Sequence, residues 1–408
     1  MLKYKSIRHA LYAIILLFAT GLGLQAFLGP FSLALLEYPF NIVIIVTVLL
    51  LAFAMCKWWT RAWLTSFLCS GATALATIFF IGALSLVLGL TLQTSENKAT
   101  DTASLLGIRQ MTTYYPFVLS YLYLIIVLSF TVVQRLIADA GKWSVASIGF
   151  FLNHAGLLLL LISTGLGTAD KKDLRLSIME GHSANKALNR NNKAEDLPFT
   201  IVLKDFCMDS YMPKLAIMNR LTNAFVPEGK PQFWDVDTLQ GQFELQGHQF
   251  SILKYYPHAL KIGEVFAQST NIATPPAIKI CNTDGTQCAW LSCGNKRQMY
   301  TTMPLGTDRS VVMLPPEAKS FASQISILYN NSTRNARIAV NHPIKIGAWS
   351  IYQTTYDENA GEASKISGMQ MIYDPWQWLT QLGFAMLILG AISLFWGHGI
   401  KKEEHGLE

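Results

Sequence analysis

The chain has 408 residues, of which 51% are hydrophobic and 14% charged, and its formal net charge is +6. So few charges, together with a positive mean hydropathy, argue against a wholly soluble protein of this length and indicate a membrane protein. The cations do not form a basic patch interleaved with aromatic side chains, so no nucleic-acid partner is expected.

Six apolar runs are long enough to cross a bilayer, for which about 20 residues are needed. The first run is followed at once by the second and lacks a cleavage site of small residues, so we expect it to remain attached as a membrane span. The sequence therefore predicts a polytopic α-helical membrane protein with six spans, at 10–29, 39–56, 64–92, 116–134, 145–168 and 376–397.

The lysines and arginines that flank these spans fall on one side of the predicted membrane, which the positive-inside rule assigns to the cytoplasm. With six spans, both termini then lie in the cytoplasm, and the long segment before the last span lies outside. The cations that set this orientation are Lys3, Lys5, Arg8, Lys57, Arg61, Arg135, Lys142, Lys401 and Lys402.

The segment before the last span differs sharply from the rest of the chain. Short alternating stretches such as "GQFELQGHQFSILKYY" are separated there by Gly, Pro, Asn and Asp, which predicts a mostly β extracytoplasmic domain with its own core. The predicted organisation is a transmembrane hairpin at 1–62, three further spans at 63–168, the β domain at 169–375, and the last span with a cytoplasmic tail at 376–408.

Four cysteines fall in this external segment. An oxidising compartment would allow two disulfides among them, and free thiols are also compatible with the sequence, so the pairing stays open. No Cys-x-x-Cys pair is present, so a thiol-redox role is not expected. The four residues are Cys207, Cys281, Cys288 and Cys293.

None of the six runs contains Asp, Glu, Lys or Arg, which argues against a proton or ion pump. The stretch "GFFLNHAGLLLLLISTGLG" does contain His154, which lies about 16 Å along a helix from Trp143 at the inner interface, near the bilayer midplane. Two interpretations of His154 remain open: a hydrogen bond to another helix, or the binding of haem iron or a proton. A cytochrome b with two haems is not expected, because it would need two pairs of membrane histidines.

A stripe of mostly small residues runs along the same predicted helix, at alternating steps of three and four. Such a stripe lets another helix approach closely and offers a docking surface. We expect Asn153, on the stripe, to serve packing, and His154, on its shoulder, to point into a cleft beside a neighbouring helix. The stripe comprises Ala146, Gly149, Asn153, Gly156, Leu160, Ser163 and Gly167.

Several separated patches resemble, in their order, the ResB family (also called CcsB), one half of the System II machinery for cytochrome c maturation. The resemblance covers roughly residues 65–397. The family's usual plan is three spans, an external domain and a last span, so the run 10–56 is interpreted as an added N-terminal hairpin. The patches are "YYPFVLSYLYLIIVLSF", "IGFFLNHAGLLLLLISTGLGTAD", "MEGHS", "LPFTIVLKDF", "AVNHPIKIGAWSIYQTTYD" and "SGMQMIYDPWQWLTQLGFAMLILG".

The resemblance implies a function. ResB-like proteins act with a ResC (CcsA) partner in the bacterial inner membrane, where they move haem outward and present it to apocytochrome c for thioether bonding to its Cys-x-x-Cys-His motif. By this resemblance, His154 is an axial ligand of the haem iron and the partner supplies the second ligand. The tryptophan-rich segment and external histidine pair of the ResC half are absent from this sequence. We therefore assign no catalytic residue and expect the chain to work only as part of a cytochrome c synthase complex.

The sequence also allows an alternative function: a structural membrane subunit or receptor whose β domain binds a peptide or envelope component without haem. Under either function, the external histidines are expected to be ordinary surface residues. These are His182, His248, His258 and His342.

Overall fold

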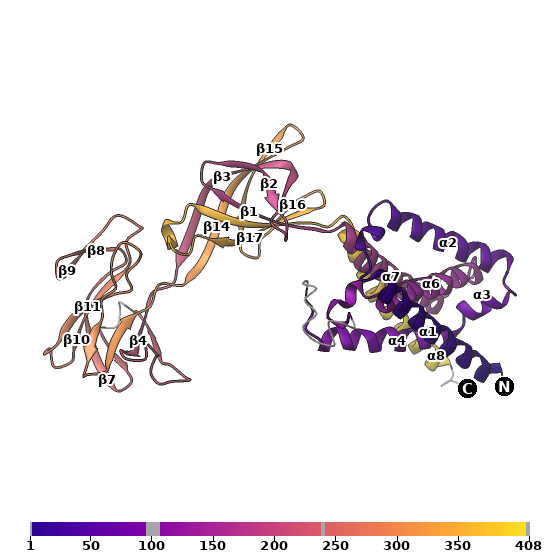
Figure 1. Cartoon of the computed structure of the whole chain (residues 1–408), viewed down its shortest axis with the longest axis horizontal. Helices are drawn as coiled ribbons and strands as arrows, with labels where there is room; N and C mark the ends of the chain where they lie inside the picture. Colours follow the sequence, from indigo (N-terminus) through magenta and orange to yellow (C-terminus); the bar gives the residue numbers. More distant parts are fainter. Residues whose placement is uncertain (1, 95–106, 238–240, 405–408) are drawn as a thin grey trace. The chain divides into compact units, whose positions relative to one another are not determined.

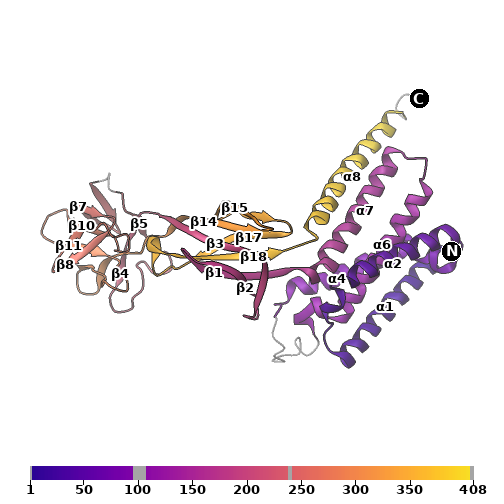
Figure 2. The same cartoon turned by 90° about the horizontal axis from the view of Figure 1, so that it is seen from above.

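The computed structural model of the protein describes residues 2–94, 107–237 and 241–404, with side chains described for residues 7–94, 107–237 and 241–395. The chain divides into two compact units (Figures 1 and 2). A helical unit comprises Met1–Lys171 and Tyr373–Glu408, and a β unit comprises Lys172–Ile372.

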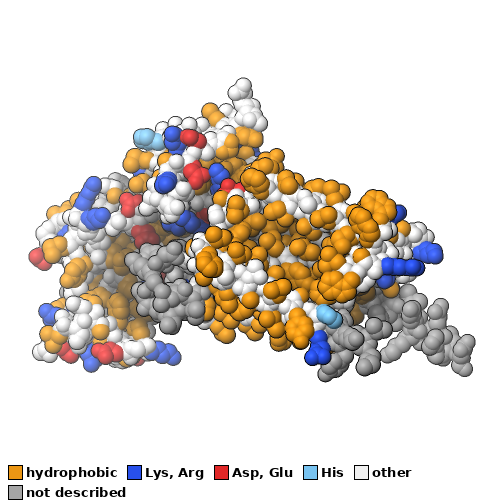
Figure 3. Space-filling model, turned by 45° about the vertical axis from the view of Figure 1, so that its right-hand side comes forward, with side chains coloured by type: hydrophobic (Ala, Val, Ile, Leu, Met, Phe, Trp, Pro, Cys, Tyr) orange, Lys and Arg blue, Asp and Glu red, His pale blue; other side chains and the backbone are white. Residues whose placement is uncertain are grey.

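Among the described residues, six helices are long and apolar enough to cross a membrane. Hydrophobic side chains cover most of the visible face of the helical unit, with lysine and arginine side chains at its edge (Figure 3). Six such helices with an inserted β unit confirm the fold class that the sequence predicts. The α-helices are α1 (Leu2–Leu28), α2 (Phe40–Trp58), α3 (Trp63–Leu68), α4 (Gly71–Leu90), α6 (Tyr115–Ala138), α7 (Val145–Gly165) and α8 (Gln377–Glu404).

The apolar run predicted as one span at 64–92 is divided in two, which corrects that boundary. Ser70 has extended backbone angles, and its hydroxyl accepts a hydrogen bond from the backbone N–H of Thr73 at 3.2 Å. Serine at this position is a favoured helix N-cap, so the membrane-length helix α4 starts anew at Gly71. Hydropathy alone did not register this break, because the residues on both sides of it are apolar.

Helix α6 is the centre of the helical unit. It packs against α1, α2, α4 and α7, whereas α7 makes its most extensive contact with α8. Helix α1 also packs against α4. Helix α6 continues to Ala138, beyond the predicted end of its apolar run, and this places Arg135 in its last turn. An ion pair of 2.6 Å joins Arg135 Nε to Asp139, one helical turn farther on.

The β unit contains a strongly elongated, eight-stranded sheet with the order β15-β14-β3-β2-β1-β18-β17-β16. Its longest pairing, β3 with β14, is antiparallel and joins residues far apart in the sequence. The strands are β1 (Lys172–Met179), β2 (Ser183–Leu188), β3 (Ala194–Ser210), β14 (Ala318–Tyr329), β15 (Ser332–Ala339), β16 (Ile344–Ile346), β17 (Trp349–Tyr356) and β18 (Ile366–Tyr373).

The chain between β3 and β14 folds into two four-stranded sheets and a hairpin. Side chains from both four-stranded sheets share one apolar core, in which Ile217, Phe250 and Ile278 are almost fully buried. The strands are β4 (Lys214–Asn219), β5 (Phe233–Asp235), β6 (Gln242–Leu245), β7 (His248–Tyr256), β8 (Ala259–Ile262), β9 (Val265–Gln268), β10 (Ala277–Asn282), β11 (Cys288–Ser292), β12 (Met303–Leu305) and β13 (Arg309–Met313).

One disulfide is present among the four cysteines of this unit. Cys281 and Cys288 lie opposite each other on the paired strands β10 and β11 and are bonded. Cys207 is an exposed free thiol, and Cys293 is a partly buried one, whose burial raises its pKa to about 11. The possibility of two disulfides is therefore not realised.

Candidate functional site

The stripe of small residues on α7 is covered by α8. A Cβ atom added to Gly156 would lie 2.9 Å from the carbonyl oxygen of Gly383, and one added to Gly390 would lie 2.6 Å from the Asn153 amide. The Thr380 hydroxyl donates to Ser163 at 2.9 Å along the same interface. The predicted close approach of a helix is confirmed. The neighbour belongs to this chain, however, so the stripe is not open as a docking surface for a partner.

Asn153 serves this packing, as the sequence predicts. Its side-chain amide donates to the backbone carbonyl of Gly149 at 3.0 Å, within its own helix, and lies against Gly390 of α8. The face of α7 that carries Asn153 is thus closed by backbone contacts on both helices.

The far end of the same interface is fixed by Asp170, which ends the 3₁₀ turn after α7 (η3, Leu166–Asp170). One carboxylate oxygen accepts from the backbone N–H of Tyr38, and the other accepts from the Asn41 amide and the Trp376 indole, all at 2.7 Å. Asn41 is fully buried. This cluster, which we call the Asp170 junction, ties together the beginning of α2, the end of α7 and the start of α8.

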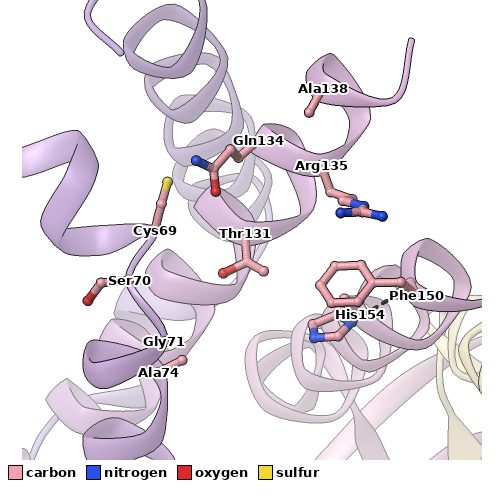
Figure 4. A pocket seen from close by; sticks show the side chains of 10 residues that line it. All are labelled: Cys69, Ser70, Gly71, Ala74, Thr131, Gln134, Arg135, Ala138, Phe150 and His154. Carbon is pink, nitrogen blue, oxygen red and sulfur yellow. Dashed lines mark hydrogen bonds between the residues drawn. The ribbon is translucent and has the colours of Figure 1, made fainter. Parts of the chain in front are cut away.

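His154 lies on the shoulder of the stripe, as predicted, and is half-buried. Its Nδ1 is 2.8 Å from the backbone carbonyl of Phe150, one turn earlier, and the two rings stack with centroids 3.8 Å apart. Because a carbonyl can only accept, the neutral imidazole carries its hydrogen on Nδ1 and keeps a lone pair on Nε2. Figure 4 shows that second nitrogen directed away from α7 into an open space.

That space is a pocket of about 410 Å³ within the helical unit. Its volume falls within the range of small-molecule sites, about 300 to 1,000 Å³. The break between α3 and α4 forms one wall, α6 another, and α7 the wall with the imidazole (Figure 4). The lining residues are Cys69, Ser70, Gly71, Ala74, Thr131, Gln134, Arg135, Ala138, Phe150 and His154.

Arg135 gives the pocket a cationic end. Its guanidinium carbon lies 5.0 Å from the centroid of the Phe150 ring, on which His154 also stacks. A guanidinium over an aromatic face is attracted by the ring's negative face. The side chain thus lies over Phe150 in the pocket lining and brings a positive charge to a site that contains both polar and apolar side chains (Figure 4).

The pocket contains a side chain that could bind a metal, His154. No group of three or more His, Cys, Asp or Glu side chains that could hold an ion occurs among the described residues. A histidine that binds metal through one nitrogen usually donates a hydrogen bond from the other, often to a backbone carbonyl, and His154 does so here. His154 is also the one imidazole in the pocket lining. The pocket therefore offers a single nitrogen that could bind a metal, His154 Nε2, beside polar and apolar side chains.

The other polar groups singled out in the sequence do not join this pocket. The four external histidines belong to the β unit, where His182 contacts the carbonyl of Glu180, and His258 lies 3.7 Å from Glu362. Arg135, Gln134 and Phe150 were not singled out as site residues. The spacing of Phe150, four residues before His154, was the available signal, because such pairs face each other on a helix.

Two motifs of the family resemblance have structural roles in this chain. In "SIYQTTYD", the buried Gln353 accepts from Ser323 at 2.7 Å and Ser367 at 3.0 Å, which links β14, β17 and β18. In "YDPWQW", Asp374 accepts from the backbone N–H of Trp376 at 3.2 Å and pairs with Lys171 at 3.1 Å. Gln353 thus stabilises the β unit, and Asp374 stabilises the start of α8 in the helical unit.

Part of the chain matches a known protein family. The model of the ResB-like family matches residues 308–366, a segment that contains β13 to β17 and does not reach α7. None of the curated proteins matches the chain. This partial match agrees with the patches quoted from the sequence and supports a similarity to the ResB-like family.

Proposed function

We propose that the protein is a membrane component of System II cytochrome c maturation that holds haem through His154 during the passage of haem across the membrane. Haem is its cargo, shared with a ResC/CcsA-type membrane partner that supplies the second axial ligand. The complex then presents haem to the Cys-x-x-Cys-His motif of apocytochrome c. The chain supplies binding and orientation and is not a synthase by itself.

The observation that carries this proposal is how the two nitrogens of the His154 ring are used. Its Nδ1 is committed to the Phe150 carbonyl at 2.8 Å, and Nε2 is directed into a pocket of about 410 Å³. A histidine that merely joined two helices would direct its free nitrogen at a donor on the neighbouring helix. Here the helix that packs most closely, α8, lies on the stripe side of α7, and His154 faces the pocket that α3, α4 and α6 border.

The proposal includes an orientation in the bacterial inner membrane. The basic loops face the cytoplasm by the positive-inside rule, so both termini are cytoplasmic and the β unit is extracytoplasmic. In this orientation the rim of the pocket at Arg135 is at the cytoplasmic end of α6. Haem would then reach His154 from the cytoplasmic side, and the β unit would lie on the side of the membrane where apocytochrome c is matured.

The test is the haem content of the complex co-expressed with a ResC-type partner and purified in detergent. His154→Ala should reduce haem per complex at least about tenfold, as expected when a metal ligand is removed. His182→Ala, an exposed histidine of the β unit, is the matched control and should keep the haem. A His154→Ala complex with unchanged haem content and absorbance spectrum would contradict the proposal and would favour the haem-free structural subunit or receptor.

A further inference from the structure

The position of the Arg135 side chain is unusual for a cation in the last turn of a membrane helix. Long basic side chains near helix ends normally extend toward the interface, where water solvates the charge. Arg135 instead lies over the Phe150 ring and lines the pocket. The guanidinium and the imidazole stack on one phenyl ring, so their separation is no more than the sum of the two centroid distances, 5.0 Å and 3.8 Å.

The internal contacts of Arg135 leave donors for a ligand. The ion pair with Asp139 uses Nε, at 2.6 Å, and one terminal nitrogen makes only a long contact of 3.4 Å to the Ser147 hydroxyl. A guanidinium carries five N–H donors in a planar fork that matches a carboxylate. The side chain remains 39% exposed. Gln134, its neighbour in the chain, also lines the pocket, with its amide directed toward Cys69 (Figure 4).

We infer that Arg135 binds a carboxylate group of the ligand whose metal is held by His154. The inference rests on the proposed function and specifies which part of the ligand lies where. Haem is a planar, mostly apolar ring that carries ionised carboxylate groups. These groups cannot remain unpaired in the hydrocarbon of the membrane, because burying an unpaired charge is strongly unfavourable. The Arg135 guanidinium supplies a partner for such a carboxylate. The carboxylate edge of haem therefore points toward the end of α6 that carries Arg135.

Asp139 forms an ion pair with the Arg135 guanidinium. Its carboxylate lies 2.6 Å from Nε, one turn beyond Arg135, and leaves the two terminal nitrogens of the guanidinium outside this ion pair. Removing Arg135 alone would leave Asp139 without its partner, which could disturb the end of α6. The paired variant Arg135→Gln/Asp139→Asn removes both charges together and avoids this.

The experiment compares two probes on the haem-depleted complex with its ResC-type partner: haem, and haem dimethyl ester, which lacks ionised carboxylates. The unaltered complex should bind haem about tenfold or more tightly than the ester, as expected for a charge-assisted hydrogen bond. Arg135→Gln and the paired variant should lose this preference by weakening haem binding alone, leaving ester binding within about twofold. Arg135→Lys should restore part of the preference, since lysine keeps the charge but not the fork.

Lys142→Gln is the matched control, because Lys142 is a cation of the neighbouring loop that does not line the pocket. It should keep the full preference for haem. Equal binding of the two probes by the unaltered complex, or a preference that survives in Arg135→Gln, would overturn the inference while leaving the His154 proposal standing. If His154→Ala binds both probes as tightly as the unaltered complex does, the proposed function fails and the inference fails with it.

Discussion

Two polar sites on one helix of this protein differ in how completely their hydrogen-bonding groups are used. Just after α7, the Asp170 carboxylate accepts three hydrogen bonds of 2.7 Å, two from the beginning of α2 and one from the start of α8. In the middle of α7, the His154 ring makes one hydrogen bond, to its own helix, and directs the other nitrogen into a pocket. Burying a polar group in a membrane is unfavourable. A polar group whose hydrogen bonds are all made within the protein therefore indicates a structural role, whereas one with an unused nitrogen or oxygen indicates a ligand site.

The largest expected effect on folding comes from the saturated site. Asp170→Ala leaves the Asn41 amide and the Trp376 indole without their acceptor, and should lower the free energy of unfolding by about 3 kcal/mol or more. His154→Ala should cost only about 1 kcal/mol, a usual value for a single substitution. Thermal unfolding of the full chain in detergent measures both. Equal losses for the two variants would remove the distinction between a structural and a binding site.

The second prediction concerns which face of α7 is closed. Gly156→Leu places a side chain where a Cβ would already be 2.9 Å from the Gly383 carbonyl, so it should force α8 away and cost about 2 kcal/mol. Gly82→Leu on α4 is the control, since nothing lies within 4 Å of a Cβ there. Its stability should be unchanged or slightly higher, because leucine favours the helix more than glycine does. If both variants are equally stable, the face of α7 that carries Gly156 is not covered by α8.

The third prediction extends the comparison to the β unit, where the buried Gln353 side chain is hydrogen-bonded on both its oxygen and its nitrogen. Gln353→Leu would leave the buried hydroxyls of Ser323 and Ser367 without their shared acceptor, and should cost about 2 kcal/mol. Gln268→Leu, at an exposed position of β9, should change the stability by less than about 0.5 kcal/mol. Urea unfolding followed by far-ultraviolet circular dichroism distinguishes them, and a stable Gln353→Leu variant would show that this network is dispensable.

The smallest expected effect is the response of the β unit to acid. Burial raises the pKa of Asp173, but hydrogen bonds from Gln370 and Arg190 outweigh it, so the pKa lies below its ordinary value. A carboxyl with a lowered folded-state pKa stabilises the protein above its unfolded pKa of about 4, and that stabilisation is lost as the pH falls through the folded value. Asp173→Asn should therefore flatten the decline in unfolding temperature below about pH 4. Asp284→Asn, in the exposed loop after β10, should leave the decline as steep as before.

Much of the fold could be predicted from the sequence, because the signals concerned are long or periodic. Each of the six spans was visible as an apolar run, and the stripe through Gly149 and Gly156 indicated a closely packed helix. The identity of that helix was not visible. Residues of α7 and α8 lie on either side of the β unit in sequence, and nothing local in "GFFLNHAGL" says that Gly383 and Gly390 are the neighbours.

The site could be predicted only in part, for a similar reason. His154 is conspicuous as a histidine in an apolar run. The pocket, in contrast, depends on the interruption of the helix at Ser70, which hydropathy does not reveal. Arg135 was counted as one flanking cation among several. Its role depends on the extension of α6 to Ala138 and on the direction of the side chain over Phe150, which are properties of three-dimensional packing.

The most direct test of the account uses a variant that can be repaired chemically. His154→Gly, in the complex with the ResC-type partner that we propose, removes the imidazole and leaves space in the pocket for a free one. The account predicts that this complex loses its haem and its absorbance spectrum, and that both return when imidazole is added with haem. Full haem content and an unchanged spectrum in His154→Gly, before any imidazole is added, would show that His154 does not hold the iron.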